Sequence, residues 1–170
     1  VWVLENSLQV VCEQKAYIVE PGEILLMNPD MVHEFHKVDE VCTFLCLQVD
    51  SNAFTAVRNL MLHTPQLKDY LSHQQMEQVR KLLAKLAGSY LEGKPFFELE
   101  CISLVGGLFH AVLTSAPFHW VTLEEAKQQE ARNARLERLL QFVDENYMHR
   151  ICLTDFARQE GCSMSYLSHF

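Results

Sequence analysis

The spacing of apolar positions predicts strands over the first third of the chain. Short apolar runs recur there between turn residues. Pro21-Gly22 favours a type II turn, because proline fixes φ at the second position and glycine accepts a positive φ at the third. Short strands with regular turn signals are typical of an antiparallel sandwich or barrel. The runs are LQVVC (8–12), KAYIV (15–19), GEILLM (22–27), HEFHKV (33–38) and VCTFLCLQV (41–49).

From Gln74 onward the apolar period becomes that of a helix. One seam with spacings of three and four ends near Gly93 and Pro95, and a second seam follows it. The second helix also carries a neighbouring apolar row, so more than half of its circumference is apolar and it needs cover on two sides. The two seams are Met76, Val79, Leu83, Leu86 and Tyr90, and then Ile102, Val105, Phe109 and Val112.

Two interpretations of these helices stay open. They pack only within the chain, against the sheet, or they also meet a second copy of the chain. Two apolar strips exceed what one sheet face requires, which favours a dimer. Gly106 and Gly107 cost about 1 kcal/mol each relative to alanine, and a close helix–helix approach would offset that cost. The dimerisation residues would be Met76, Val79, Leu83, Leu86, Ile102, Val105 and Phe109.

The end of the chain has the pattern of two short helices joined by a tight turn. An amphipathic helix near 136–147 precedes the stretch LTDFARQEGCSMSYLSHF. Ala157 is small where two helices would cross, Gly161 suits a left-handed turn, and Ser163 can cap the next helix. These are the needs of a helix-turn-helix, and an ordinary helical hairpin is the alternative. The DNA-contacting candidates are Ser163, Ser165, Tyr166, Ser168 and His169.

Charge and composition limit the classes of protein to which the chain can belong. The chain has 170 residues, 49% of them apolar, and a net charge of −8. Residues 1–131 hold 9 Lys and Arg against 17 Asp and Glu, whereas residues 132–170 hold five of each, so charge alone does not indicate nucleic-acid binding. No apolar run reaches the roughly 20 residues of a membrane span. There is no secretory signal and no CxxC pair among the six cysteines, which predicts a cytoplasmic protein with reduced thiols.

The stretch RLERLLQFVDENYMHRICLTDFARQEGCSMSYLSHF resembles the start of the DNA-binding module of AraC-type (AraC/XylS) transcriptional regulators. Phe156 stands where that family usually has leucine. The front of the chain resembles the cupin-like sensor of the same family: VWVLENSLQV is similar to a cupin turn with Asn6 in place of glycine, and PGEILLMNPDMVHEF is similar to a later strand–turn–strand. The matched positions of the tail are Leu153, Phe156, Ala157, Gly161, Ser163, Ser165, Tyr166, Leu167, Ser168 and Phe170.

This resemblance implies an α+β chain. A cupin-like antiparallel β-barrel or sandwich would be followed by a helical pair and a partial helix-turn-helix DNA-binding module. The early barrel strands of the family, before Val1, and its second helix-turn-helix, after Phe170, are missing, so we expect a fragment. The expected parts are residues 1–50 (sensor), 51–115 (connection and dimerisation helices), 116–133 (linker) and 134–170 (first half of the DNA-binding module).

A cupin-like barrel would bind a small effector inside its walls. The pocket candidates are Trp2, Leu4, His33 and Phe35, which are bulky apolar groups with one polar group among them. Some cupins are metal enzymes, but a metal site needs three or four ligands. His33 is the one candidate with a suitable position, and a hydrogen-bonded pocket histidine is the simpler interpretation. We therefore expect no metal and no cofactor.

Together these features predict a ligand-responsive, bacterial-type transcriptional regulator rather than an enzyme. Its expected partners are promoter DNA, a small-molecule effector for which a sugar is the first candidate, and a second copy of the chain. No membrane partner is expected. The main alternative is a metal-dependent cupin enzyme, isomerase or dioxygenase-like, with an unrelated helical tail. A unit that serves only for dimerisation or partner binding is a third hypothesis.

Overall fold

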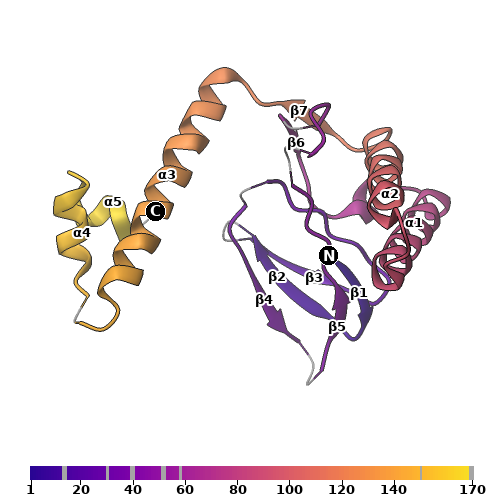
Figure 1. Ribbon diagram of the computed structural model, residues 1–170, viewed down its shortest axis with the longest axis horizontal. Coiled ribbons are helices and arrows are strands. Elements are labelled where there is room, and N and C mark those ends of the chain that lie inside the picture. The colour runs from indigo at the N-terminus through magenta and orange to yellow at the C-terminus, as the bar shows by residue number, and fades with distance from the viewer. Residues whose placement is uncertain are drawn as a thin grey trace. The chain divides into compact units, whose positions relative to one another are not determined.

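The computed structural model divides the chain into two compact units, residues 1–121 and 122–170 (Figure 1). Each unit is described by itself below. The structure describes residues 1–12, 15–29, 31–38, 41–50, 53–57, 59–149 and 151–168.

The strands lie in the first unit, and every paired strand is antiparallel. Within the described residues they form three small sheets, in the orders β1–β5, β3–β2–β4 and β6–β7. The expected class, α+β with antiparallel strands, is thus confirmed. The strands are β1 (Trp2–Glu5), β2 (Leu8–Cys12), β3 (Lys15–Val19), β4 (His33–Lys37), β5 (Thr43–Leu45), β6 (Leu60–Leu62) and β7 (Phe118–Trp120).

The described strands do not close into a barrel. A barrel needs one continuous ladder around its circumference, and here the ladders are separate. The register of β1 shifts between Val3 and Glu5, and Asn6 has a φ of 57°, so the chain turns away before β2 begins. The run 22–27 forms two isolated bridges, at Ile24 and Leu25, instead of a strand.

The run 22–27 forms no strand because Ile24 and Leu25 point in different directions. Both side chains are buried, but Ile24 belongs to the core cluster under the helices and Leu25 to the cluster under the sheets. The apolar run is therefore covered on both sides, as the sequence indicates, by two different sets of neighbours. Its backbone groups form hydrogen bonds with residues 1 and 3, with residues 65–67 and within the 20–23 turn, so it pairs with no single strand along its length.

Two helices, α1 (His73–Glu92) and α2 (Phe97–Leu113), lie side by side in the first unit (Figure 1). Ser72 and Gln75 form a capping box at the start of α1. At its end, Gly93 adopts a φ of 57°, which glycine allows without a Cβ penalty. A methyl group at Gly107 would lie 3.8 Å from Leu82, so this glycine sits at the close approach of α2 to α1.

The larger core cluster is built mainly from one face of each helix. Met76, Val79, Leu83 and Leu86 of α1 and Val105 of α2 are all buried in it. The remaining buried members are Ile24, Leu60, Leu62, Leu67, Leu71, Leu104, Leu108, Ala111, Val112 and Ala116.

The stretch 116–133 contains regular structure. Strand β7 pairs with β6, with Phe118 opposite Leu62. Helix α3 (Leu123–Asn146) begins directly afterwards, where Thr122 and Glu125 form a capping box. The helix continues without a break through the region expected to be an amphipathic helix.

The second unit holds α3, α4 (Leu153–Gln159) and α5 (Met164–Ser168). Its small core consists of Phe156, Ala157 and Leu167, which are buried against the partly buried Leu139 and Phe142 of α3. The rings of Phe142 and Phe156 lie 5.4 Å apart. The apolar row of α3 is therefore split, because Leu140 is 60% exposed.

Candidate functional site

An aromatic row lies along strands β4 and β5. The rings of His33 and Phe35 are 5.1 Å apart, and those of Phe35 and Phe44 are 5.4 Å apart. Directly opposite residues of an antiparallel pair share one sheet face, and Phe35 pairs with Val10 while Phe44 pairs with Val3. Val3 and Val10 are fully buried, whereas Phe35 is 38% exposed. The aromatic row therefore borders a buried apolar cluster, and its rings are partly exposed to solvent.

We call this surface the aromatic face and define it by His33, Phe35 and Phe44. Three further side chains that sequence reasoning missed, Tyr17, Met27 and Met31, pack against the same buried cluster. Their signal in the sequence was weak, because each lies in a different segment. His33 is fixed by a 2.8 Å contact between its Nδ1 and the carbonyl oxygen of Met31. Bulky apolar walls with one oriented polar ring suit the recognition of a small organic molecule.

Trp2 and Leu4 do not join the aromatic face. Val3 points into the cluster beneath that face, and successive side chains of a strand point to opposite sides. Trp2 packs instead against the helical core cluster, and Leu4 is 44% exposed. The structure thus brings His33 and Phe35 together and places Trp2 elsewhere.

Two buried polar atoms lie beside the helical core cluster without a hydrogen-bond partner among the described residues, the Trp2 Nε1 and the Tyr70 hydroxyl. Burial raises the pKa of Tyr70 well above its usual range, so its hydroxyl stays protonated. Both atoms are donors, and an unpaired buried donor costs free energy.

The residues expected to dimerise fall into two groups. Met76, Val79, Leu83, Leu86 and Val105 are buried within the chain, where the two helices and the sheet cover them. The others differ, since Phe109 is partly buried against Phe54 and Ile102 is 55% exposed.

Where α1 ends and α2 begins, apolar side chains face solvent. We call this surface the tip patch, and its members are between 55% and 83% exposed. Both charge signs lie beside it, with Lys85 bonded to Glu100 at 3.0 Å and Lys94 bonded to Glu92. The tip patch consists of Tyr90, Leu91, Phe96, Leu99 and Ile102.

The turn between α4 and α5 has the geometry that its sequence indicates. Gly161 adopts a φ of 63°. The N–H of Cys162 donates to the Ala157 carbonyl at 3.0 Å and the N–H of Gly161 to the Arg158 carbonyl at 3.3 Å, which is the paired ending of a Schellman motif. The Ser163 hydroxyl accepts from the Tyr166 N–H at 3.1 Å and so caps α5.

Electrostatic contacts tie α3 to this hairpin. Arg138 of α3 donates two hydrogen bonds of 2.7 Å to the two carboxylate oxygens of Glu160. These bonds raise the pKa of Arg138 and hold that of Glu160 below its usual range. Arg135 lies 5.1 Å from the ring centroid of Tyr166 and donates to its hydroxyl at 2.6 Å. Arg135, Cys162, Ser163 and Tyr166 line a shallow depression.

The remaining DNA-contacting candidates are Ser165, Ser168 and His169. Ser165 is exposed on α5, and Ser168 is the last residue of that helix. His169 lies outside the described residues.

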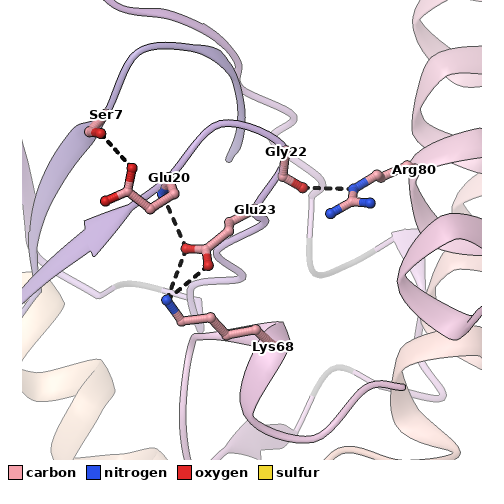
Figure 2. Close-up of polar contacts among 6 residues, drawn as sticks. All are labelled: Ser7, Glu20, Gly22, Glu23, Lys68 and Arg80. Atoms are coloured by element: carbon pink, nitrogen blue, oxygen red, sulfur yellow. Dashed lines mark hydrogen bonds and ion pairs between the residues drawn. The ribbon is translucent and has the colours of Figure 1, made fainter. Parts of the chain in front are cut away.

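A polar network links the sheets to α1 (Figure 2). The Arg80 Nε donates to the Gly22 carbonyl at 2.7 Å, and Lys68 contacts both carboxylate oxygens of Glu23 at 2.9 and 3.0 Å. Ser7, at the start of the β2 region, donates to Glu20 at 2.7 Å. The turn at 20–23 is therefore held from three sides.

Comparison with known proteins identifies the family of the domain. Residues 7–109 match the family model of the AraC-like ligand binding domain. The chain belongs to this family. The match spans strands β2 to β6, the aromatic face, all of α1 and most of α2. This domain is generally the sensor of a regulator rather than an enzyme. No curated protein matches the chain, and no solved structure does.

Two further findings concern the described residues of this AraC-like chain. None of their helices is both long enough and apolar enough to cross a membrane. Within the same residues, no three histidine, cysteine, aspartate or glutamate side chains gather closely enough to hold a metal ion.

Proposed function

We propose that the chain is part of a ligand-responsive transcriptional regulator that binds promoter DNA in the cytoplasm as a homodimer. The observation that carries this proposal is the order of its parts. An AraC-like ligand binding domain is followed by a helical hairpin with a left-handed glycine, a capping serine and a core of its own.

The aromatic face supports the sensing role. His33, Phe35 and Phe44 offer flat rings beside a buried apolar cluster, and a histidine nitrogen supplies a hydrogen bond. Rings of this kind stack on the apolar face of a sugar or on a small aromatic metabolite. The effector class we propose is therefore a small polar molecule with one flat apolar face.

A thermal-shift screen with sugars and small aromatic metabolites tests this proposal. A hit should raise Tm in proportion to the logarithm of ligand concentration. Phe35→Ala should weaken that response about tenfold or more. Ile18→Ala is the matched control, because Ile18 is similarly exposed, at 44%, on the opposite face of the same sheet. Equal losses in both variants would contradict binding at the aromatic face.

The α4–α5 hairpin supports the DNA-binding role. Its second helix is capped by Ser163, and Ser165 and Tyr166 lie on its exposed side. Both α3 arginines nearest the hairpin are engaged by Glu160 or Tyr166, and residues 132–170 carry no net charge. Phosphate contacts supply most of the affinity of such proteins. We therefore expect this chain to bind duplex DNA weakly, with a small dependence on salt.

Selection from random duplex DNA, followed by gel shift, tests the DNA-binding role. Ser165→Glu should abolish binding of the selected sequence, since it places a carboxylate against the phosphates. Gln159→Glu adds the same charge to an exposed position of the same unit and should reduce binding only slightly. Equal effects of the two variants on binding of the selected sequence would contradict this role for α5.

The tip patch supports dimerisation. Its five residues are between 55% and 83% exposed, and an exposed apolar patch on a soluble domain marks an interaction site. The lysines and glutamates at its edge already pair within the chain, so they form a polar rim around the apolar centre. The predicted seam residues that are buried would then support the interface from beneath, whereas Ile102 would lie within it.

Sedimentation distinguishes residues that form a dimer interface from residues that only support the fold. Ile102→Glu should convert a dimer to a folded monomer, because its side chain is 55% exposed. Ala84→Glu places the same charge on an exposed position of α1 and should leave the dimer intact. Leu83→Glu buries a charge in the core and should unfold the unit. A wild-type oligomeric state in the Ile102 variant would exclude the tip patch.

Metal analysis of the purified chain separates this proposal from the cupin-enzyme alternative. Stoichiometric iron, manganese or zinc would favour the enzyme, and its histidine ligands would have to be identified.

A further inference from the structure

We propose that residues 22–28, which we call the relay segment, couple the sensing strands to the start of α3, with Asn28 as the positioning residue at the output end. The inference rests on the proposed function, since it names how the sensor would act on the second unit. It goes further by assigning a route and a residue.

The input end of the relay segment is bonded to β1 and to Val1, the residue before it. The N–H of Gly22 donates to the Val3 carbonyl at 2.8 Å, the N–H of Val3 donates to the Glu23 carbonyl at 3.1 Å, and the N–H of Leu25 donates to the Val1 carbonyl at 2.8 Å. Val3 is opposite Phe44 in the β1–β5 pair. A change at the aromatic face therefore reaches the relay segment through one strand pair.

The body of the relay segment is held by its surroundings. Arg80 and Lys68 fix the 20–23 turn (Figure 2), and the side chains of Ile24 and Leu25 enter separate core clusters. Packed cores change between discrete arrangements and do not deform continuously. A shift at the input would therefore move the segment as one piece.

Asn28 forms the output contact. Its side-chain amide donates to the Leu62 carbonyl at 3.0 Å, and its side-chain oxygen accepts from the Leu62 N–H at 2.8 Å. One side chain thus satisfies both backbone groups of a β6 residue, as a neighbouring strand would. Aspartate, alanine or serine at this position could not make both bonds in this geometry.

Strand β6 passes this constraint to β7 and to the unit boundary. Leu62 is opposite Phe118, and the N–H of His63 donates to the Pro117 carbonyl at 3.0 Å. At the far end of the ladder, the N–H of Val121 donates to the Asn59 carbonyl at 2.7 Å. The next residue, Thr122, is the N-cap of α3. The β6–β7 ladder therefore holds Val121, the last residue of the first unit, directly before α3 begins.

Amide hydrogen exchange by NMR tests the route without DNA or effector, so its failure is separable from failure of the proposed function. In Asn28→Ala, the Val121 amide should exchange about tenfold faster, because two bonds that hold β6 are lost. The Val10 amide, in the centre of the three-stranded sheet, should be unchanged. Asn6→Gly is the matched control. It removes an asparagine that donates to the Val41 carbonyl at 2.7 Å, and glycine accepts its positive φ.

Coupling is measured from the input end. Gly22→Ala strains a residue with a φ of 84°, although its methyl group would make only ordinary contact with Arg80, at 3.5 Å. The strain should also accelerate exchange at Val121. If the effect travels through Asn28, the double variant should exchange no faster than Asn28→Ala alone. Additive effects, or an unchanged Val121 amide in a folded Asn28→Ala, would overturn the proposal. If that variant does not fold, Asn28→Asp keeps the acceptor oxygen and decides by the same comparison.

Discussion

The second unit depends on one aromatic side chain. Phe156 is fully buried, and its ring centroid lies 5.4 Å from that of Phe142. Among the described residues of the unit, few others are buried. Replacing a buried phenylalanine with alanine costs about 3–5 kcal/mol. A unit of this length has a stability of roughly 2–7 kcal/mol at the usual value per residue. Phe156→Ala should therefore unfold most of residues 122–170 at room temperature.

The chain offers a clean assay for this prediction. Its two tryptophans, Trp2 and Trp120, both lie in the first unit, so tryptophan fluorescence reports that unit, whereas circular dichroism at 222 nm reports both. In urea, Phe156→Ala should lose helical signal at zero denaturant and keep the wild-type fluorescence midpoint. Leu140→Ala, at a 60% exposed position of α3, should change neither signal by much. A fluorescence midpoint that falls together with the helical signal would refute the two-unit reasoning.

Three further predictions follow from local geometry. Hydrogen bonds from Arg138 hold the pKa of Glu160 below the usual 4.5. The ionised carboxylate therefore stabilises the folded second unit above pH 4.5, and this stabilisation is lost as the pH falls through the lowered pKa. Acid titration of the helical signal should show this loss, and Glu160→Gln should remove it. Gly161→Ala should destabilise the second unit by about 1 kcal/mol, since φ is 63° although no atom obstructs a Cβ. Gly88→Ala, in the middle of α1 with open space around it, should stabilise the first unit by about 0.5–1 kcal/mol in urea unfolding, and a loss of stability would contradict the helix-propensity argument.

Much of the secondary structure was predictable because its signals are local. The short apolar runs 8–12 and 15–19, bounded by turn residues, give strands with the expected bounds. The helical period from Gln74 and the stop at Gly93 give α1. Gly161 and Ser163 occupy the turn and cap positions that their chemistry indicates.

The rest depends on which partner covers each apolar surface, and periodicity does not carry that information. Four members of the α1 seam are covered by their own chain, whereas Tyr90 and Ile102, which continue the two seams by the same spacing, are exposed in the tip patch. The period does not separate the covered seam residues from the exposed ones. Strand β7 has three residues, too few for alternation, and its partner β6 is distant in sequence. The sequence predicted two members of the aromatic face, His33 and Phe35, because they share one strand. It did not predict the positions of Trp2 and Phe44, because the sheet face to which each points depends on cross-strand pairing.

The pairing of β6 with β7 also has a consequence for synthesis of the protein on the ribosome. Leu60–Leu62 emerges early, yet the strand that completes its ladder emerges only after both α1 and α2 have been made. Until Phe118 leaves the exit tunnel, β6 has a free edge of backbone donors and acceptors, and such edges invite pairing with other chains. In that interval, the amide of Asn28 on its other side is the contact already available to hold the strand. Asn28 would thus protect the nascent chain from aggregation before it has any second unit to control.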